Sequence, residues 1–288
     1  MAAYNDSVRV AAFFERVGAK EKRWWILPEY GFTGAELGHL SSYQVFESFS
    51  ESSLIIQALS SDIQSLKEGR SLLVDITGLM RSHILFILWY LKSSGISKVD
   101  MVYTEPTHYS RKAETTFTEE IAAVRQIAGF EGAHQPVYTN DVLILGVGYD
   151  DASMGRVILD KENASLIQLR SLPSLSADMY QESLLRLDLV AGVESRPADG
   201  RIHFSSANDP YVTADTLSGA WRHLNAQNPI TNLYLSPLAT KVQALGFGLF
   251  YLQELVGHPA SIILPEVRTY SKKTSTGIGR SWLYPVHL

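Results

Sequence analysis

One segment of the chain is repeated in outline, and this repeat constrains the fold more than any other feature. Residues 72–112 contain a short apolar run, a loop of small residues with one basic residue, a long apolar segment, a second apolar run and a closing Tyr-Ser pair followed by two basic residues. Residues 233–273 follow the same order. The basic residue of the loop is Arg81 in one copy and Lys241 in the other, and its distance from the closing tyrosine is nearly equal, 109 − 81 = 28 and 270 − 241 = 29.

Each copy has the pattern of a strand, a helix and a second strand. Residues 72–76 form a short run rich in apolar side chains, which is typical of a parallel strand covered on both faces. Residues 83–91 are apolar on nearly every side, which predicts a buried helix, and residues 99–103 form the next strand. Parallel strands need such a crossover, and it should be right-handed. We therefore predict an α/β fold of duplicated Rossmann-like units with mainly parallel sheets, divided near Asn140 into halves of residues 1–140 and 141–288.

Shorter patterns predict the elements around the repeat. Residues 9–14 and 54–59 are mostly apolar, and we predict strands there. Residues 61–68 indicate a polar helix that ends at Gly69, and residues 119–127 a further helix. Residues 142–147 form a strong strand pattern that runs into a glycine-containing loop.

Composition narrows the classes of function. A formal net charge of −5 and a pI near 5.9 argue against a protein that coats nucleic acid, because such binding needs many cations. The chain has no cysteine, which excludes disulfides, thiolate metal sites and cysteine nucleophiles and suits a cytoplasmic protein. Its apolar runs fall far short of the roughly 20 residues that span a bilayer, and the N-terminal residues lack the apolar core of a secretory signal. We expect a cytoplasmic location and no membrane partner.

No familiar catalytic or cofactor motif identifies an activity. Residues 146–148 read Gly-Val-Gly and begin like a dinucleotide fingerprint, but the third glycine position holds Asp151, a carboxylate where pyrophosphate would lie. The chain has no Walker A, HExxH, GxSxG or EF-hand sequence, and its eight histidines show no metal-ligand spacing. The sequence therefore leaves the cofactor open and predicts no metal site.

The polar residues that follow the strands of both copies are the candidates for ligand binding. Small residues let a backbone approach a ligand, a helix N-terminus offers unpaired N–H groups, and Arg or Lys supplies the countercharge, so the requirements of an anion site are present twice. The alternative is that a duplicated fold keeps small residues for tight turns and basic residues for its surface. The predicted ligand-binding residues are Asp75, Thr77, Arg81, Tyr109 and Arg111 in the first copy, and Ser236, Thr240, Lys241, Tyr270 and Lys272 in the second.

Residues 75–81, Asp-Ile-Thr-Gly-Leu-Met-Arg, resemble the D-x-T-G-G-T-K strand-to-helix motif of CRISPR-associated Rossmann-like (CARF) sensor domains. Residues 238–241, Leu-Ala-Thr-Lys, resemble the end of that motif. Two such units in one chain are similar to the SAVED domain of anti-phage signalling systems. The resemblance implies a doubly wound fold that senses a cyclic oligonucleotide, with Thr77, Arg81, Thr240 and Lys241 near its phosphates. The chain departs from the motif at Leu79 and Met80, which replace a glycine and a threonine.

Three hypotheses about function follow. In the first, a nucleotide-like ligand with several phosphates binds in the cleft between the halves, and the signal passes to an effector protein or through a homo-oligomer. In the second, carboxylates near the strand ends hold a divalent cation and support nucleotide or phosphoester chemistry. In the third, the chain is a structural subunit whose partner contacts are the aromatic residues 24–25 and 282–284. The residues considered for the second hypothesis are Asp75, Glu105, His108, Asp150 and Asp151.

Overall fold

The computed structural model describes residues 1–109, 121–190, 200–267, 269–270 and 275–288. Contacts within the chain define two compact units, which we call unit 1, residues 1–120 and 267–288, and unit 2, residues 121–266. The predicted halves, 1–140 and 141–288, have different bounds: they place residues 121–140 in the first half and residues 267–288 in the second. The C-terminal residues belong to unit 1 because their strand β14 (Ser281–His287) pairs along β5 (Lys98–Thr104).

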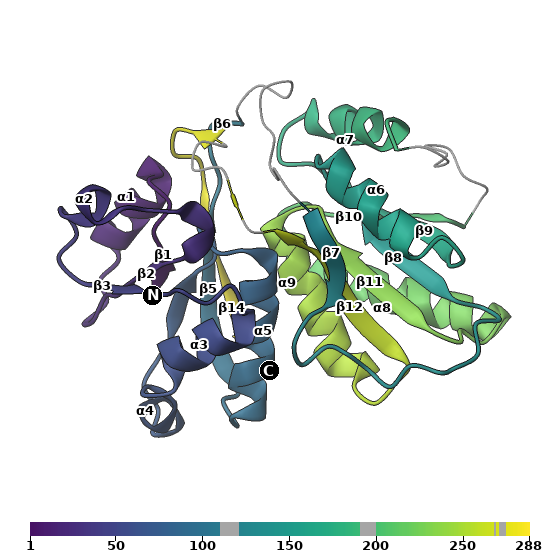
Figure 1. Ribbon diagram of the computed structural model, residues 1–288, viewed down its shortest axis with the longest axis horizontal. Coiled ribbons are helices and arrows are strands. Elements are labelled where there is room, and N and C mark those ends of the chain that lie inside the picture. The colour runs from purple at the N-terminus through teal and green to yellow at the C-terminus, as the bar shows by residue number, and fades with distance from the viewer. Residues whose placement is uncertain (110–120, 191–199, 268, 271–274) are drawn as a thin grey trace. The chain divides into compact units, whose positions relative to one another are not determined.

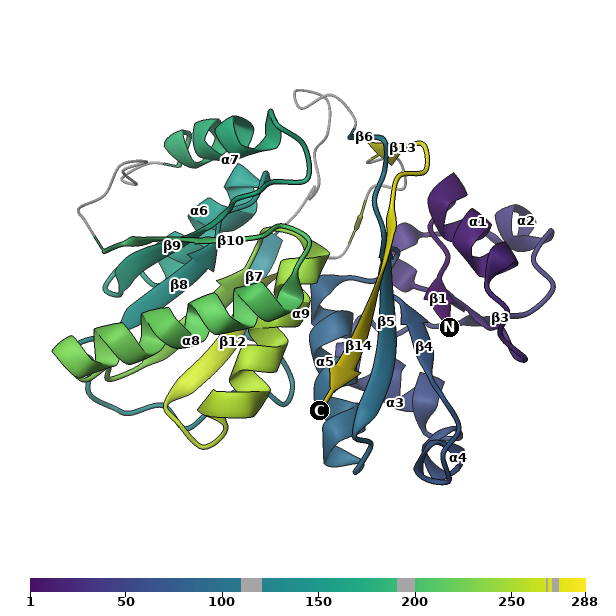
Figure 2. The same ribbon diagram turned by 180° about the vertical axis from the view of Figure 1, so that it is seen from behind.

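Unit 1 contains a six-stranded sheet in the order β14-β5-β4-β1-β2-β3. Its first five strands in chain order are parallel, and β14 is antiparallel to β5. Helices α1 and α2 cover one face, and α3 and α5 cover the other (Figures 1 and 2). The remaining bounds in unit 1 are β1 (Ala2–Ala3), α1 (Val8–Arg16), β2 (Trp24–Ile26), η1 (Pro28–Tyr30), α2 (Gly34–Leu37), β3 (Tyr43–Val45), α3 (Glu51–Leu59), α4 (Ile63–Lys67), β4 (Leu73–Asp75), α5 (Arg81–Ser93), and the small pair β6 (His108–Tyr109) and β13 (Ser275–Thr276).

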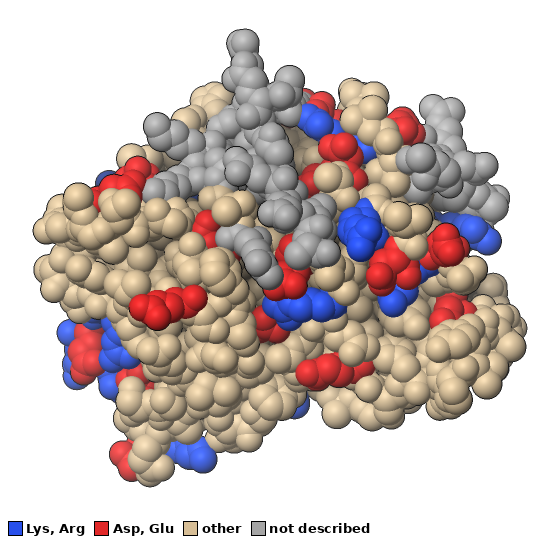
Figure 3. Space-filling model, viewed as in Figure 1, with Lys and Arg blue, Asp and Glu red and all other residues tan. Residues whose placement is uncertain are grey.

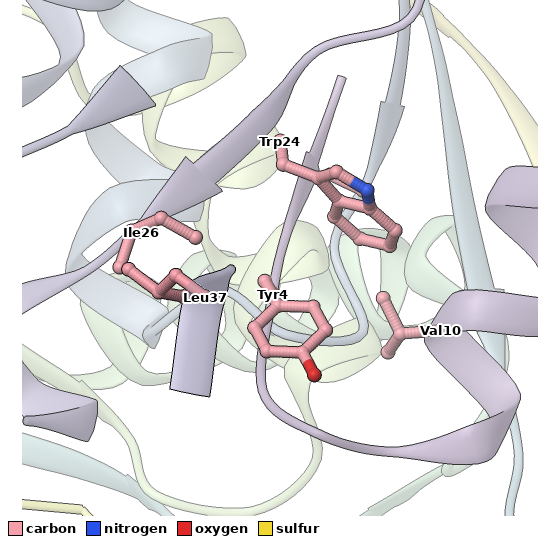
Figure 4. Close-up of a cluster of buried hydrophobic side chains, with 6 residues drawn as sticks. Tyr4, Val10, Trp24, Ile26 and Leu37 are labelled. Atoms are coloured by element: carbon pink, nitrogen blue, oxygen red, sulfur yellow. The ribbon is translucent and has the colours of Figure 1, made fainter. Parts of the chain in front are cut away.

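Apolar side chains from strands and helices hold α1 and α2 on the sheet of unit 1. Tyr4 and Trp24, from the β1–β2 side of the sheet, meet Val10 of α1 and Leu37 of α2 in a buried cluster (Figure 4). The indole of Trp24 stacks on Phe14, with 3.7 Å between ring centroids. Burying aromatic groups of this size is a main source of stability in a small core. This packing fixes α1 beside the carboxyl end of β1.

Unit 2 contains a second six-stranded sheet, in the order β10-β9-β8-β11-β12-β7. Strands β8 to β12 are parallel. Helices α6 and α7 lie on one face (Figure 1), and α8 and α9 lie on the other (Figure 2). The bounds are β7 (Ile121–Gln126), β8 (Val142–Gly146), α6 (Asp151–Asp160), β9 (Ser165–Ser171), α7 (Met179–Asp188), β10 (Ile202–Ser205), α8 (Pro210–Gln227), β11 (Leu233–Pro237), α9 (Lys241–Phe250), the π-helical turn η2 (Tyr251–Leu255) and β12 (Ala260–Val267).

The two units share one topology, which confirms the predicted α/β fold of duplicated Rossmann-like units. Strands β1 to β5 and strands β8 to β12 are arranged in the same order in their sheets. The registers agree as well: Asp75 pairs with Val102, and Leu235 pairs with Ile262. Each residue of the unit 2 pair is offset from its counterpart in unit 1 by the same number of residues, 235 − 75 = 160 and 262 − 102 = 160. The duplication therefore holds residue by residue through this part of each sheet.

Three predicted elements differ from the structure. Residues 9–14 lie in helix α1 and residues 54–59 in helix α3, where we predicted strands, and residues 121–126 form strand β7, where we predicted a helix. In α3 the buried residues Leu54, Ile55, Ala58 and Leu59 recur at helical spacing and cover one face. Short apolar runs do not separate strand from helix, and the packing of the whole unit decides between them.

Each sheet reverses its strand order at one point, between β1 and β4 in unit 1 and between β8 and β11 in unit 2. In open parallel sheets, ligands bind outside the carboxyl ends of the strands at such a switch point. The loops after β1 and β4 in unit 1, and those after β8 and β11 in unit 2, therefore lie where such sheets bind ligands. In the described part of the chain, no helix combines the length and the apolar character needed to cross a bilayer.

Candidate functional site

In unit 1, two of the predicted ligand-binding residues brace the loop that follows β4. The backbone N–H of Thr77 donates to Asp75 Oδ1 at 2.9 Å, and Thr77 Oγ1 accepts from the backbone N–H of Thr104 at 2.9 Å. All three residues are buried, and Thr104 ends the neighbouring strand β5. Asp75 and Thr77 therefore tie the β4 loop to β5 from inside the protein.

Gly78, in the same loop, packs directly against β1. A Cβ atom at Gly78 would collide with the carbonyl oxygen of Ala3, so the loop can lie this close to β1 only with glycine here. The Tyr30 hydroxyl donates to Gly78 O at 2.8 Å and is also hydrogen-bonded by the side chain of Asn5. Burial raises the pKa of Tyr30 well above its usual value, so the phenol keeps its proton. Side chains after β1 and β2 thus converge on the β4 loop.

The two helices that begin at the switch point of unit 1 have no side-chain caps. Ser7 stands at the N-cap of α1 and Met80 at the N-cap of α5, and neither side chain accepts a hydrogen bond from its helix. Arg81 is the first residue of α5 and is half-buried. Uncapped helix starts carry unsatisfied N–H groups and a partial positive charge.

Arg9, in the first turn of α1, is a buried cation at the same edge of the sheet. The residue is 6% exposed, and its Nη1 donates to Thr104 O at 2.9 Å. Its guanidinium lies 6.0 Å from the centre of the Tyr103 ring. Within the described residues no carboxylate forms an ion pair with Arg9, and its buried Nε has no hydrogen-bond acceptor. We predicted Arg9 inside a strand, and no sequence pattern distinguishes it from a surface arginine.

Glu29 is a second buried ionisable group near these loops. Its Oε1 lies 3.6 Å from Nε2 of the buried His83, and its Oε2 has no hydrogen-bond partner among the described residues. Burial raises the pKa of Glu29 to about 7, and the negative charge of Glu51 adds to the shift. Glu29 is therefore partly protonated near neutral pH.

The C-terminal part of unit 1 reaches this region through Tyr270. The backbone N–H of Tyr270 donates to Glu29 O at 2.9 Å, and its ring meets Tyr30 edge-on with 6.0 Å between centroids. Tyr109 lies in β6, paired with Ser275 of β13. Arg111 and Lys272 lie outside the described residues. The structure thus brings the predicted residue Tyr270 against Tyr30.

In unit 2, the side chain of Thr240 caps helix α9. Thr240 Oγ1 accepts from the backbone N–H of Gln243 at 3.0 Å and donates to Ala207 O at 2.6 Å, and the Gln243 side chain completes a capping box. Lys241 is the first residue of α9 and is half-buried, as Arg81 is in α5. Ser236 is fully buried in β11, and its hydroxyl has no partner among the described residues.

The loop after β8 in unit 2 ends in an acidic helix start. Asp150 caps α6 by accepting from the backbone N–H of Ser153 at 3.0 Å and from its hydroxyl at 2.8 Å, and Asp151 pairs with Arg186 at 3.3 Å. A Cβ atom at Gly148 would collide with Leu238 O. The Gly-Val-Gly sequence therefore serves close packing between two loops, and a carboxylate occupies the helix start.

The residues considered for a metal-dependent enzyme occupy separate places. In unit 1, Asp75 braces the β4 loop, Glu105 Oε1 accepts from Trp282 Nε1 at 2.9 Å, and His108 lies in β6. In unit 2, Asp150 and Asp151 begin α6. Among the described residues, no group of three or more His, Asp or Glu side chains is arranged to hold a metal ion.

The visible surface carries charges of both signs. On the face shown in Figure 3, Lys and Arg atoms lie among Asp and Glu atoms and do not gather into a patch of one sign. Comparisons with protein-family models, with curated proteins and with solved structures found no match to this chain.

Proposed function

We propose that the chain binds a nucleotide-like ligand that carries several phosphates, at the carboxyl edges of its Rossmann-like units. The observation that carries this proposal is the repeated cation at the switch point: Arg81 and Lys241 are each the first residue of the helix that follows the fourth parallel strand of their unit. Their numbers differ by 241 − 81 = 160, the same offset that relates the paired strands.

The position of these two cations favours phosphate. A helix start contributes N–H donors and the positive end of the helix dipole, and an adjacent Arg or Lys adds a full charge. Both side chains are half-buried, so solvent screens their charges less than on an open surface. Each cation would pair with a phosphate group at the carboxyl edge of its own unit.

The proposal extends to signalling in anti-phage defence by a cyclic oligonucleotide, which the resemblance of residues 75–81 and 238–241 supports. We propose that the output passes to an effector protein or to another copy of the chain. In this account the protein acts in the cytoplasm, where such a nucleotide would be produced and sensed.

A thermal-shift screen against linear, cyclic and oligomeric nucleotides tests the proposal. A ligand at about 100 times its dissociation constant stabilises the folded state by about 2.7 kcal/mol, which raises the melting temperature by several degrees. We expect Arg81→Ala and Lys241→Ala each to weaken the shift. Lys98→Ala is the matched control, because Lys98 is exposed at the opposite end of β5. A screen in which no nucleotide stabilises the wild-type protein would contradict the proposal.

A further inference from the structure

The buried charge of Arg9 is not compensated by the described residues of unit 1. A buried guanidinium offers five N–H donors and a full positive charge, yet the described residues supply Arg9 with one hydrogen bond, to Thr104 O, and no carboxylate. Burying a charge without a countercharge is costly, and buried arginines are normally paired. The carbonyl of Thr104 alone would be satisfied by a neutral donor.

The uncapped starts of α1 and α5 add partial positive charge at the same edge of the sheet. Arg9 lies in the first turn of α1, whose N-cap Ser7 makes no cap bond, and α5 begins without a side-chain cap after Met80. The Thr104 carbonyl that Arg9 contacts belongs to the residue whose N–H bonds Thr77 in the β4 loop. The unpaired cation therefore lies against the strand end that supports the switch-point loop.

We infer that unit 1 contains an oxyanion site centred on Arg9, which binds a phosphate group through the guanidinium and the uncapped start of α1. Arginine suits this role because its planar fork donates two parallel hydrogen bonds to a phosphate oxygen pair. Arg9 would be a further ligand-binding residue, separate from Arg81 and Lys241. The inference does not require the phosphate to belong to a nucleotide, and it stands if the proposed function fails.

The electrostatic surroundings are compatible with an anion. Arg9 and Glu29 both act on the Tyr30 hydroxyl, so the carboxyl group of Glu29 lies in the same cluster. With its pKa raised to about 7, that group carries about half of a negative charge at neutral pH. Its repulsion of a bound anion is correspondingly reduced.

Phosphate and pyrophosphate are the probes for the test. The melting temperature of the full chain is measured while either anion replaces chloride at constant ionic strength, for the wild type, Arg9→Met, Arg9→Lys and Arg16→Met. The methionine substitution keeps the length of the side chain and removes its charge, whereas lysine keeps the charge and loses the fork. Arg16→Met removes an exposed charge from the last turn of the same helix and serves as the control.

We expect phosphate to stabilise the wild type and Arg16→Met equally, and to leave the melting temperature of Arg9→Met unchanged. Phosphate should bind Arg9→Lys at least about tenfold more weakly than the wild type, since one charged hydrogen bond contributes at least about that factor. If Arg9→Met does not fold, the Arg9→Lys titration decides. No phosphate-specific stabilisation of the wild type, or an equal one in Arg9→Lys, would overturn the inference. A nucleotide shift that depends on Arg81 and Lys241, in a wild-type protein that phosphate and pyrophosphate do not stabilise, would overturn the inference while supporting the proposed function.

Discussion

The switch points of the two units have the same strand order but opposite chemistry at their helix starts. In unit 2, Asp150 caps α6 and Thr240 caps α9, so side chains of the unit itself occupy both helix starts. In unit 1, the equivalent helices α1 and α5 begin without side-chain caps, and the first turn of α1 carries the buried Arg9. The sheet does not require either arrangement, because both units fold to one topology. The difference therefore points to unit 1 as the better anion-binding edge.

The close packing of the switch-point loops also differs between the two units. In unit 1 the glycine that permits contact is Gly78, after β4, and it meets the backbone of Ala3. In unit 2 the residue at the matching place after β11 is Leu238, since 238 − 78 = 160, and the glycine is Gly148, after β8. Both units thus need one glycine between the two loops, but on different strands.

The largest expected effect is on the free energy of unfolding and comes from the buried carboxyl group of Glu29 in unit 1. The pKa of Glu29 is raised from 4.5 to about 7, so the folded state retains this proton while the unfolded state loses it. Stability should therefore fall as pH rises from about 4.5 to about 7, and the loss is complete above that range. We expect Glu29→Gln to be more stable than the wild type at pH 8, by on the order of 3 kcal/mol, and to lose this pH dependence.

Chemical denaturation at several pH values measures this effect. Glu162→Gln is the control, because Glu162 is an exposed glutamate in unit 2. An equal pH dependence in the wild type and Glu29→Gln would show that Glu29 is paired or solvated, which would contradict its description as a buried carboxyl group with a raised pKa.

A smaller effect is expected where the loops meet. Gly78→Ala and Gly148→Ala should each destabilise the protein by about 2 kcal/mol, because the added methyl group meets backbone atoms that cannot move aside. Gly219→Ala should instead stabilise it by about 0.5 to 1 kcal/mol, since Gly219 lies within α8 with open space around it. Denaturation midpoints measure all three, and a neutral Gly78→Ala would contradict the close approach to β1.

The smallest effect separates the capped helix from the uncapped one. Thr240→Ala should cost about 1 kcal/mol, because it removes the cap of α9 and the bond to Ala207 O. Ser7→Ala should cost less than about 0.5 kcal/mol, because the Ser7 side chain makes no cap bond. Equal losses in the two variants, measured by urea denaturation, would remove the difference between the helix starts.

The sequence predicted those parts of the fold whose elements are buried on both sides. Strands β4, β5 and β8 and the helix α5 appear in the sequence as runs rich in apolar residues, because most of their side chains are buried. The two-residue strand β1 is too short to leave a pattern, although it forms the centre of the sheet in unit 1. The C-terminal strand β14 joins unit 1 through a pairing that no local pattern encodes.

The candidate site was predictable only in part. The repeat identified Arg81 and Lys241, because duplication kept a cation at one helix position. It did not show that Asp75, Thr77 and Ser236 lie inside the protein, where hydrogen bonds and packing decide their roles. Arg9 was missed because its burial arises from contact with Thr104, 95 residues away.

A crystal structure of the full chain grown in phosphate tests the central contrast most directly. We expect a phosphate within hydrogen-bonding distance of the Arg9 guanidinium in unit 1, and none at the start of α6 in unit 2, where the carboxylate of Asp150 already caps the helix. A phosphate at the start of α6, with none at Arg9, would contradict the account.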